Sequence, residues 1–508
     1  MKVLSAEQTR LVEQAAFKNG MSGERLMENA GAAATREINK HYPVNTLSVV
    51  VVVGQGNNGG DGYVVARKLK EYGAKVSVIM AMGIPLTKDS SLMLSRAKQA
   101  QISTLNYYDD VDLCSNLIDS ADIIVDAIFG IGFHGAPDRE VAAIIGKINR
   151  SRAQKIALDI PSGVTADDGE VHGAAIKADL TVSFIGYKLC NFKFPASNYC
   201  GKVVAVTIGT PDEACNDNYY ADVVTYKKAL ALLKDIPTNA HKGTKGTALI
   251  IGGSYGMAGA PMLAARAAMR SGAGIVKVAL PKSIYSVSAA MLPEAVFEPL
   301  LESDGSLCAQ GINGGIFKNI KSMLIGPGIG TNDGTVAAVA RALFFSKVPT
   351  VIDADGLNAL ARDTEILNQI SAPVIITPHI GEMARLVGET PEYIEKNKIA
   401  VAMEYATKNG VITVLKGAYT IIATPDEELY INATGNEAMA TAGSGDMLAG
   451  MIAAFLANGM EPTLAAVAAV CLHGAAGDMA ANDLGVRGVL TTDMIERLPY
   501  VFKPRFGR

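Results

Sequence analysis

The sequence predicts an α/β protein that is divided into two domains. Its 508 residues are more than a single hydrophobic core normally contains, so two or three domains are expected. Apolar residues make up 49% of the chain and 51 positions are glycine, which is typical of compact α/β proteins with many turns. Short β-branched runs alternate with helical patterns along the chain, as expected for parallel sheets covered by helices.

The composition argues against several classes of protein. The 50 acidic residues nearly balance 46 Lys and Arg, so no basic surface for nucleic acid or an anionic membrane is expected. The 6 cysteines include no C-x-x-C spacing, which favours a reducing cytoplasm over disulfides or metal thiolates. The N-terminus turns polar too soon for a signal peptide, and His473 and Gly474 interrupt the apolar segment 465–472, so no membrane span is expected.

The first domain is expected to begin with a capped helix and to continue as a doubly wound sheet. Ser5 and Gln8 form a capping-box pattern that opens a helix ending near Lys18. Apolar, β-branched runs predict strands at 47–53, 75–80, 123–126, 156–160, 180–185 and 203–208. Their alternation with helical patterns indicates parallel strands with helices on both faces.

Polar residues follow three of these strands. The loop GQGNNGGDG contains G-x-G-x-x-G, but the second strand lacks the terminal acid of a dinucleotide fingerprint, which disfavours a conventional NAD-dependent dehydrogenase. Asn57, Asn58 and Asp61 could coordinate a hard cation or bind ligand hydroxyls, or they could merely satisfy a turn. Asp126 and Asp159 end two other strands, so three polar loops are expected to converge at one edge of the sheet.

The first domain resembles the NAD(P)H-hydrate epimerase family. The matching motifs are LMENAG, GQGNNGGDG, VDAIFGIGFHG and LDIPSGV, which span most of residues 1–210. The resemblance implies a Rossmann-like domain over residues 1–215, with a potassium ion held by Asn58, Asp126 and Ser162. It also implies that the hydrated nicotinamide nucleotide contacts Asn57, Asn58, Gly59, Gly60, Asp61, Gly130, Ile131, Gly132, Phe133, His134, Gly135, Ala136 and Asp159.

Asp159 is the candidate for proton transfer during interconversion of the two C6 epimers of that nucleotide. A carboxylate at a buried strand end can have a raised pKa, which suits a group that accepts and returns a proton.

A polar, turn-rich linker at 211–240 precedes a second α/β domain, which is expected over residues 225–508. A short helix is expected near 227–233, and strands at 247–251, 274–279, 323–325, 350–352, 374–376 and 411–415. Asp353, Asp355 and His379 follow strands and would open on one face, although each could simply cap a turn or lie on the surface.

A turn of small residues at 440–445 leads into Asp446 and an apolar helix. Backbone N–H groups at a helix N-terminus, with a carboxylate beside them, can hold an anion next to a base. The alternative on these residues alone is a glycine-rich loop in which Asp446 is an ordinary first-turn acid.

The second domain resembles the NAD(P)H-hydrate dehydratase family, which has a ribokinase-like fold. The matching motifs include HKGTKG, GGSYGMAGAP, GPGIGT, DADGLN, LKGAYT and NATGNEAMATAGSGD, and they cover nearly all of residues 240–450. The sequence departs from the usual pattern at Ile380, where Pro is common, and at Ala438 and Ala442, where Gly is common. The Cβ of Ala442 could narrow a phosphate pocket in the turn.

Together the resemblances imply a bifunctional repair enzyme for hydrated NADH and NADPH. It would interconvert the (R) and (S) epimers and dehydrate the (S) epimer at the expense of a nucleotide, with ADP favoured over ATP and with magnesium. Asp446 would take the proton of the C6 hydroxyl while the turn stabilises the transferring phosphoryl group. The nucleotide would contact Lys416, Gly417, Ala418, Tyr419, Thr420 and Gly445, and the hydrated substrate would face Ala260, Gly328, His379 and Asp446.

A ribokinase-like small-molecule kinase, with a non-catalytic N-terminal binding or scaffold domain, is the alternative function. It would share the Gly-Ser-Gly-Asp turn, but a scaffold has no need for Asn58, Asp61, Asp126, Asp159 and Ser162 together. We expect a cytoplasmic homo-oligomer, either a tetramer or an octamer, with small-molecule ligands and without nucleic-acid or membrane partners.

Overall fold

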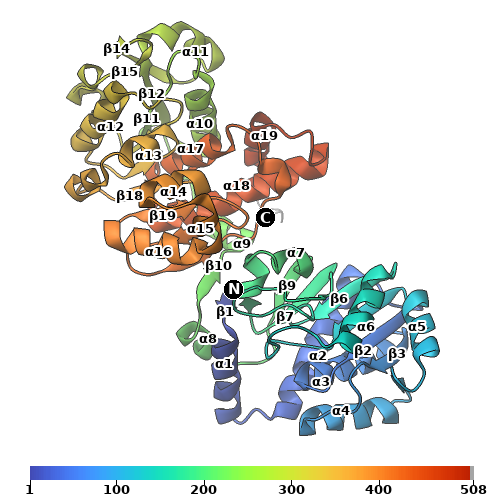
Figure 1. Ribbon diagram of the computed structural model, residues 1–508. Helices are drawn as coiled ribbons and strands as arrows, with labels where there is room; N and C mark the ends of the chain where they lie inside the picture. The colour runs from blue at the N-terminus through green and yellow to red at the C-terminus, as the bar shows by residue number, and fades with distance from the viewer. Residues whose placement is uncertain (504–508) are drawn as a thin grey trace. The chain divides into compact units, whose positions relative to one another are not determined.

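The chain forms two compact units, Met1–Asp222 and Val223–Arg508, in this computed structural model. The structure describes residues 1–503, apart from the side chains of residues 368 and 369, so residues 504–508 of the expected second domain lie outside the described residues. Both units combine helices with sheets whose strands are mostly parallel, which confirms the predicted fold class (Figure 1). The division between the units lies between the expected domain limits, 215 and 225.

The sheet of the first unit has seven parallel strands in the order β4-β3-β2-β5-β6-β7-β9. These strands are β2 (Ser48–Val53), β3 (Lys75–Met80), β4 (Ser103–Asn106), β5 (Ile123–Ala127), β6 (Gln154–Leu158), β7 (Leu180–Phe184) and β9 (Lys202–Val206). The strand order reverses between β2 and β5, so the carboxyl ends of these two strands border the crevice where such sheets bind ligands. Strand β4 was not predicted, because its short, partly exposed sequence lacks an apolar run.

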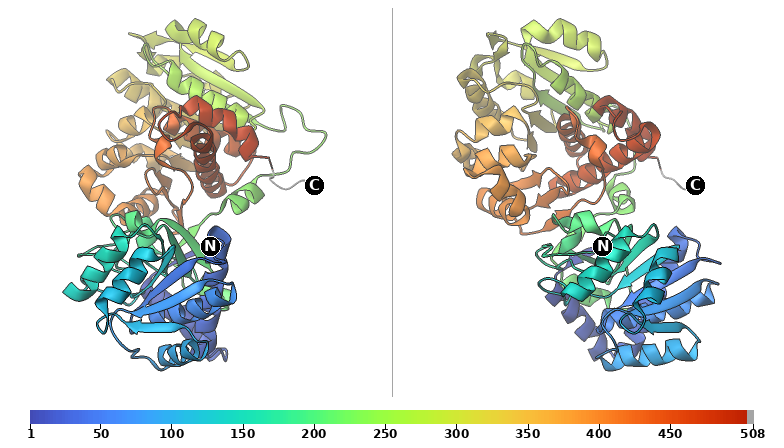
Figure 2. Two further views of the ribbon diagram at one scale, coloured as in Figure 1. Left: turned by 90° about the vertical axis from the view of Figure 1, so that its right-hand side faces the viewer. Right: turned by 45° about the vertical axis from the view of Figure 1, so that its right-hand side comes forward.

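Helices cover both faces of this sheet, as the turned views of Figure 2 also show. Alternate residues of β2 explain this, because Val51 belongs to one hydrophobic cluster and Val52 to another on the opposite face. The helices are α1 (Ala6–Lys18), α2 (Gly23–His41), α3 (Asn57–Glu71), α4 (Lys88–Gln99), α5 (Val111–Ser120), α6 (Arg139–Arg150), α7 (Ser197–Cys200) and α8 (Asp212–Asp217). The predicted capping box of α1 is confirmed, since Ser5 and Gln8 exchange hydrogen bonds of 2.9 and 3.1 Å. Beyond the main sheet, β1 (Lys2–Leu4) pairs with β8 (Tyr187–Lys188) and with β10 (Ala221–Val223).

Only Gly54 to Gly56 of the predicted loop after β2 lie outside a helix, and its polar part from Asn57 onward forms the start of α3. Its glycines permit close packing. A Cβ on Gly59 would lie 2.2 Å from the carbonyl oxygen of Gly54, and one on Gly62 would lie 2.7 Å from the Cβ of Ala127. Helix α3 therefore begins hard against the ends of β2 and β5, which aims its first polar side chains into the crevice.

The second unit is built on strands in the order β13-β12-β11-β16-β17-β18-β19-β20-β21. These strands are β11 (Thr247–Ile251), β12 (Ile275–Pro281), β13 (Val296–Leu300), β16 (Ser322–Ile325), β17 (Thr350–Ile352), β18 (Val374–Ile376), β19 (Ile412–Leu415), β20 (Ile421–Ala423) and β21 (Leu429–Ile431). All the predicted strands are present, whereas β13, β20 and β21 were not predicted. Strands β14 (Glu302–Ser303) and β15 (Ser306–Leu307) form a separate hairpin.

Helix α17 (Ser444–Ala457) is buried at every position from Met447 onward and lies in the largest hydrophobic cluster of the second unit. The other helices are α9 (Tyr226–Leu232), α10 (Gly259–Arg270), α11 (Tyr285–Met291), α12 (Asp333–Phe345), α13 (Asp355–Leu360), α14 (Ile380–Val387), α15 (Pro391–Lys396), α16 (Lys398–Asn409), α18 (Pro462–Leu484) and α19 (Thr491–Val501). The expected linker at 211–240 thus contains α8, β10 and α9.

The expected interruption at His473 and Gly474 is wrong, because α18 runs through both residues without a break. Glycine at position 474 allows α18 to pack closely against Thr434, since a Cβ there would lie 2.2 Å from the Thr434 hydroxyl oxygen. Among the described residues, α18 alone is long and apolar enough to cross a membrane, but 72% of its apolar window is buried inside the protein. Its apolar surface is therefore used in packing the core.

The packing of α3 predicts that Gly59→Ala destabilises the first unit. The added Cβ would collide with backbone rather than with a movable side chain, so we expect a loss of about 1–3 kcal/mol in unfolding free energy. Gly56→Ala is the matched control, because a Cβ at that position would meet no atom within 4 Å and the backbone φ there is −87°. Urea unfolding monitored on both variants checks this, and equal midpoints would contradict it.

Candidate functional site

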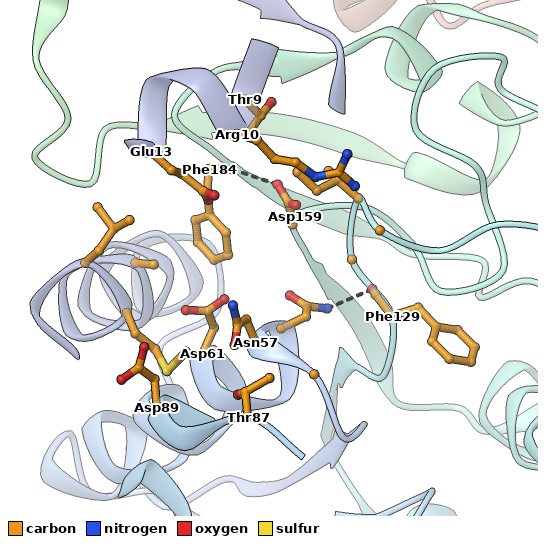
Figure 3. Close-up of a pocket in the computed structure, with 18 of the residues that line it drawn as sticks. Thr9, Arg10, Glu13, Asn57, Asp61, Thr87, Asp89, Phe129, Asp159 and Phe184 are labelled. Atoms are coloured by element: carbon orange, nitrogen blue, oxygen red, sulfur yellow. Dashed lines mark hydrogen bonds between the residues drawn. The ribbon is translucent and has the colours of Figure 1, made fainter. Parts of the chain in front are cut away.

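A cavity of about 740 Å³ lies in the first unit where the three predicted polar segments converge (Figure 3). Its walls come from α1, the first turn of α3, the loop after β5 and the end of β6. The predicted residues that line it are Asn57, Asn58, Asp61, Gly130, Ile131, Gly132, Phe133, His134 and Asp159. Gly59 and Gly60 are instead buried in the packing of α3, and Gly135 and Ala136 are not among the lining residues.

The three expected potassium ligands are linked around the backbone of Phe129. Ser162 donates its hydroxyl proton to Asp126 Oδ1 at 2.6 Å and its backbone N–H to Oδ2 at 2.8 Å. The N–H of Phe129 donates to the Ser162 hydroxyl at 2.8 Å, and its carbonyl oxygen accepts from Asn58 Nδ2 at 2.8 Å. Burial raises the pKa of Asp126 to about 6, although the hydrogen bonds from Ser162 oppose the shift.

One atom of this group has no partner. Asn58 Oδ1 is buried and accepts no hydrogen bond from any residue that the structure describes, which is uncommon for a buried amide oxygen. Amide, carboxylate, hydroxyl and carbonyl oxygens are ligands that hard cations accept. The residues present therefore fit an alkali cation.

Asp159 stands directly after β6, which ends at Leu158 rather than at the predicted residue 160. Its φ is 65°, and its carboxylate lies 2.9 Å from the ammonium group of Lys188. Lys188 is completely buried and also donates to the carbonyl oxygen of Phe184 at 2.8 Å. Lys188 was not predicted as a site residue. The one feature of the sequence that could have indicated it is the position of this lysine within an apolar segment.

Helix α1 supplies further lining residues that sequence analysis did not place at the site. They are Thr9, Arg10, Glu13 and Phe17. Burial and the charge of Asp159 raise the pKa of Glu13, and burial together with Asp159 and Glu13 raises the pKa of Asp61 well above its ordinary value. The cavity thus brings together the carboxyl groups of Glu13, Asp61 and Asp159.

In the second unit, the ends of β17, β18 and β19 meet the N-terminus of α17. Lys416 donates to Asp353 Oδ1 at 2.8 Å, and the Thr377 hydroxyl donates to the same oxygen at 2.7 Å. A Cβ on Gly445 would lie 3.0 Å from Lys416 Nζ, so the first turn of α17 reaches this ion pair. Burial raises the pKa of Asp446 to about 7, with Asp353 adding to the shift and Lys416 opposing it.

His379 is the N-cap of α14, and its Nδ1 accepts hydrogen bonds from the N–H groups of Gly381 at 2.9 Å and Glu382 at 3.2 Å. Burial and the charge of Lys416 lower the pKa of His379. The side chain nevertheless remains 55% exposed, and its Nε2 lies 3.4 Å from Glu382 Oε1. Ile380 occupies the first helical position, where Pro is favoured because its missing N–H has no partner in any case.

The turn before α17 tolerates the alanine at position 442. Ala442 is exposed and is not among the residues with positive φ, whereas Gly443 has φ 86°. The helix begins at Ser444, so Ser444 and Gly445 belong to α17 rather than to the turn. Sequence analysis missed His473, whose Nε2 lies 3.3 Å from the Ser444 hydroxyl and whose pKa burial lowers to about 4.

The remaining predicted substrate contacts in this unit lie side by side. A Cβ on Gly328, where φ is 65°, would come within 3.2 Å of the Cβ of Ala260. Lys416 to Thr420 follow β19 directly, although the ammonium group of Lys416 is already engaged by Asp353. The structure therefore collects the predicted residues at the carboxyl ends of the strands.

Comparison with known proteins assigns both regions. Residues 23–190 match the family model described as YjeF-related protein N-terminus, and residues 248–500 match that described as NAD(P)H-hydrate dehydratase. The chain is 36% identical, over 99% of its length and 96% of the relative, to the bifunctional NAD(P)H-hydrate repair enzyme of Moorella thermoacetica. The enzyme of the same name from Escherichia coli is 33% identical over 97% of this chain and 92% of its own.

A solved structure is similar to the second unit. It is the ADP/ATP-dependent NAD(P)H-hydrate dehydratase of Bacillus subtilis, co-crystallised with ATP and Mg²⁺. It is 32% identical, with a TM-score of 0.50, and the match covers 56% of this chain and 99% of that one. The two family regions in one chain and the full-length relatives lead to one conclusion: the chain belongs to the family of bifunctional NAD(P)H-hydrate repair enzymes.

Proposed function

We propose that residues 1–215 epimerise hydrated NADH and NADPH, and that residues 225–508 dehydrate the (S) epimer with a nucleotide as phosphoryl donor. The observation that carries this is the occurrence of both family regions in one chain, each with acids gathered at the ends of its parallel strands. The site residues predicted from the sequence are the proposed contacts. ADP is the preferred nucleotide in this proposal, although ATP also serves.

In the first unit, Asp159 exchanges a proton with the C6 hydroxyl of the substrate, and Lys188 orients its carboxylate. Asn57, Asn58, Asp61 and the loop after β5 hold the nicotinamide nucleotide in the cavity. Asn58, Asp126 and Ser162 would hold a potassium ion, which would supply positive charge at this edge of the cavity.

In the second unit, Asp446 takes the proton of the C6 hydroxyl while the hydroxyl oxygen forms a bond to the terminal phosphorus of the nucleotide. The phosphorus–oxygen bond to the rest of the nucleotide breaks, and that oxygen keeps the electron pair. The lone pair of the ring nitrogen then expels phosphate from C6. Phosphate leaves more readily than hydroxide would. Loss of a proton from C5 restores the double bond of the reduced cofactor.

The N-terminus of α17 and Lys416 provide positive potential for the transferring phosphoryl group. Magnesium accompanies the nucleotide in this proposal and would neutralise charge on its phosphates. The partly buried carboxylate of Asp355, which accepts hydrogen bonds from the Gly330 N–H at 2.9 Å and from Asn358 Nδ2 at 3.2 Å, would be a protein ligand of such an ion, whose other ligands are normally phosphate oxygens and water.

We place the enzyme in the cytoplasm as a homo-oligomer, either a tetramer or an octamer. All 6 cysteines are free thiols, and four of them are buried, as suits a reducing compartment.

Asp446→Asn should abolish dehydration, because the amide cannot accept the hydroxyl proton, while epimerisation continues. Recovery of NADH absorbance from mixed hydrates with Mg²⁺ and ADP or ATP measures the first reaction, and chromatography of the epimers measures the second. Asp333→Asn, an exposed acid in the first turn of α12, is the matched control and should retain both activities. Accumulation of a stable phosphorylated product by the native enzyme would favour the small-molecule kinase instead.

The pKa of Asp446 predicts the pH dependence of dehydration. A base must be unprotonated, so kcat/KM for dehydration should reach its maximum above the pKa of Asp446 and should fall as the pH decreases through about 7. Well below that point the decrease should approach about tenfold per pH unit. A rate that stays constant between about pH 8 and about pH 5.5 would remove Asp446 as the base.

Potassium should accelerate epimerisation and stabilise the first unit relative to equal concentrations of lithium. Ser162→Ala removes the hydroxyl that joins Asp126 to Phe129 and should abolish both effects. Ser90→Ala is the control, because the Ser90 hydroxyl is buried without a hydrogen-bond partner among residues 1–503. Equal rates and unfolding temperatures in the two salts would contradict a potassium site.

A further inference from the structure

Helix α1 forms a wall of the epimerase cavity although it precedes the residues matched by the family model, 23–190. Thr9 and Glu13 stand four residues apart and therefore lie on one face of the helix. Val12 is completely buried in the core, and the Ala6 N–H donates to Asp167 Oδ1 at 2.8 Å. The helix is thus anchored at its start and along its inner side, which holds Glu13 in a defined place.

Glu13 and Asp159 come from different walls of the same cavity. Figure 3 shows both carboxyl groups facing the space above Asn57 and Asp61. Asp159 is paired with Lys188, whereas no hydrogen bond or ion pair to the Glu13 carboxyl is found in the part of the chain that the structure describes. Glu13 is therefore available to a bound substrate.

Epimerisation at C6 needs two proton-transfer groups. The substrate carbon carries a hydroxyl and is bonded to the ring nitrogen N1, so one base must act on the hydroxyl and one acid on the nitrogen if the ring is to open. This argument rests on the epimerase activity proposed above.

We propose that Glu13 is a catalytic residue of the epimerase site and forms an acid–base pair with Asp159. The Asp159 carboxylate removes the C6 hydroxyl proton, the O–H electron pair becomes the second bond of a C6 carbonyl, and the C6–N1 bond breaks. N1 keeps that electron pair and receives the proton of the Glu13 carboxyl. Rotation of the C6 carbonyl group then turns its other face toward N1.

Ring closure reverses these transfers. The N1 lone pair attacks the other face of C6, Glu13 takes the N1 proton, and Asp159 returns its proton to the carbonyl oxygen. Neither oxidant nor reductant is needed, and the enzyme regains its starting protonation state. Burial and the neighbouring Asp159 charge raise the pKa of Glu13, which favours the protonated form that this role requires.

Glu13→Gln should lower the rate of epimerisation by about 10²-fold or more, measured on a purified single epimer without nucleotide and corrected for the spontaneous reaction. Glu7→Gln is the matched control, since Glu7 is exposed on the same helix. Dehydration of the (S) epimer and the unfolding temperature should not change in either variant. Glu13→Asp should recover part of the lost rate.

The pH profile separates catalysis from a structural role. An acid must be protonated, so the native rate should fall as the pH rises through the pKa of Glu13, and Glu13→Gln should lack this decrease. The role of Glu13 would be overturned if the Glu13→Gln variant epimerised at the rate of the native enzyme. It would also be overturned if the variant were slower but kept the pH profile of the native enzyme. Asp159→Asn is assayed in parallel. A native enzyme that does not epimerise would refute the proposed function itself, whereas an unaffected Asp159→Asn variant would refute the acid–base pair by removing Asp159 from it.

Discussion

Both units depend on close contact between a glycine-bearing helix and its neighbours. A Cβ on Gly59 of α3 would lie 2.2 Å from the Gly54 carbonyl oxygen, and one on Gly450 of α17 would lie 2.1 Å from that of Ala264. These contacts place a helix N-terminus where parallel strands end. Polar side chains at the start of each helix consequently face residues that follow the strands, which is how distant segments form one site.

The two sites share an electrostatic arrangement. Lys188 pairs with Asp159 in the first unit, and Lys416 pairs with Asp353 in the second. In each case a further carboxyl group stands near the pair, and burial together with the paired acid raises its pKa. In each site the lysine is already paired with another acid, so it compensates the charge of the additional acid only in part, and the pKa of that acid stays raised.

The two proposed reactions complement each other chemically. Dehydration consumes one epimer, so hydrated cofactor of the other configuration would accumulate unless the configuration at C6 were inverted. Epimerisation needs proton transfers alone, whereas dehydration needs a better leaving group and therefore a phosphoryl donor. The acids of the first unit and the helix N-terminus of the second suit these separate needs.

Local sequence determined most of the strands and helices and the motifs, because alternation, capping and apolar runs act over a few residues, whereas the short strands β4, β13, β20 and β21 gave no such signal. It thereby predicted that Asp126, Asp159 and Asp446 stand at strand or helix ends. Only the tertiary structure decided that Asn57 starts a helix, that α18 passes through His473, and which side chains meet each acid. Glu13 and Lys188 illustrate the reason, since they lie far from Asp61 and Asp159 in sequence, and contacts at such separation leave no local periodic signal.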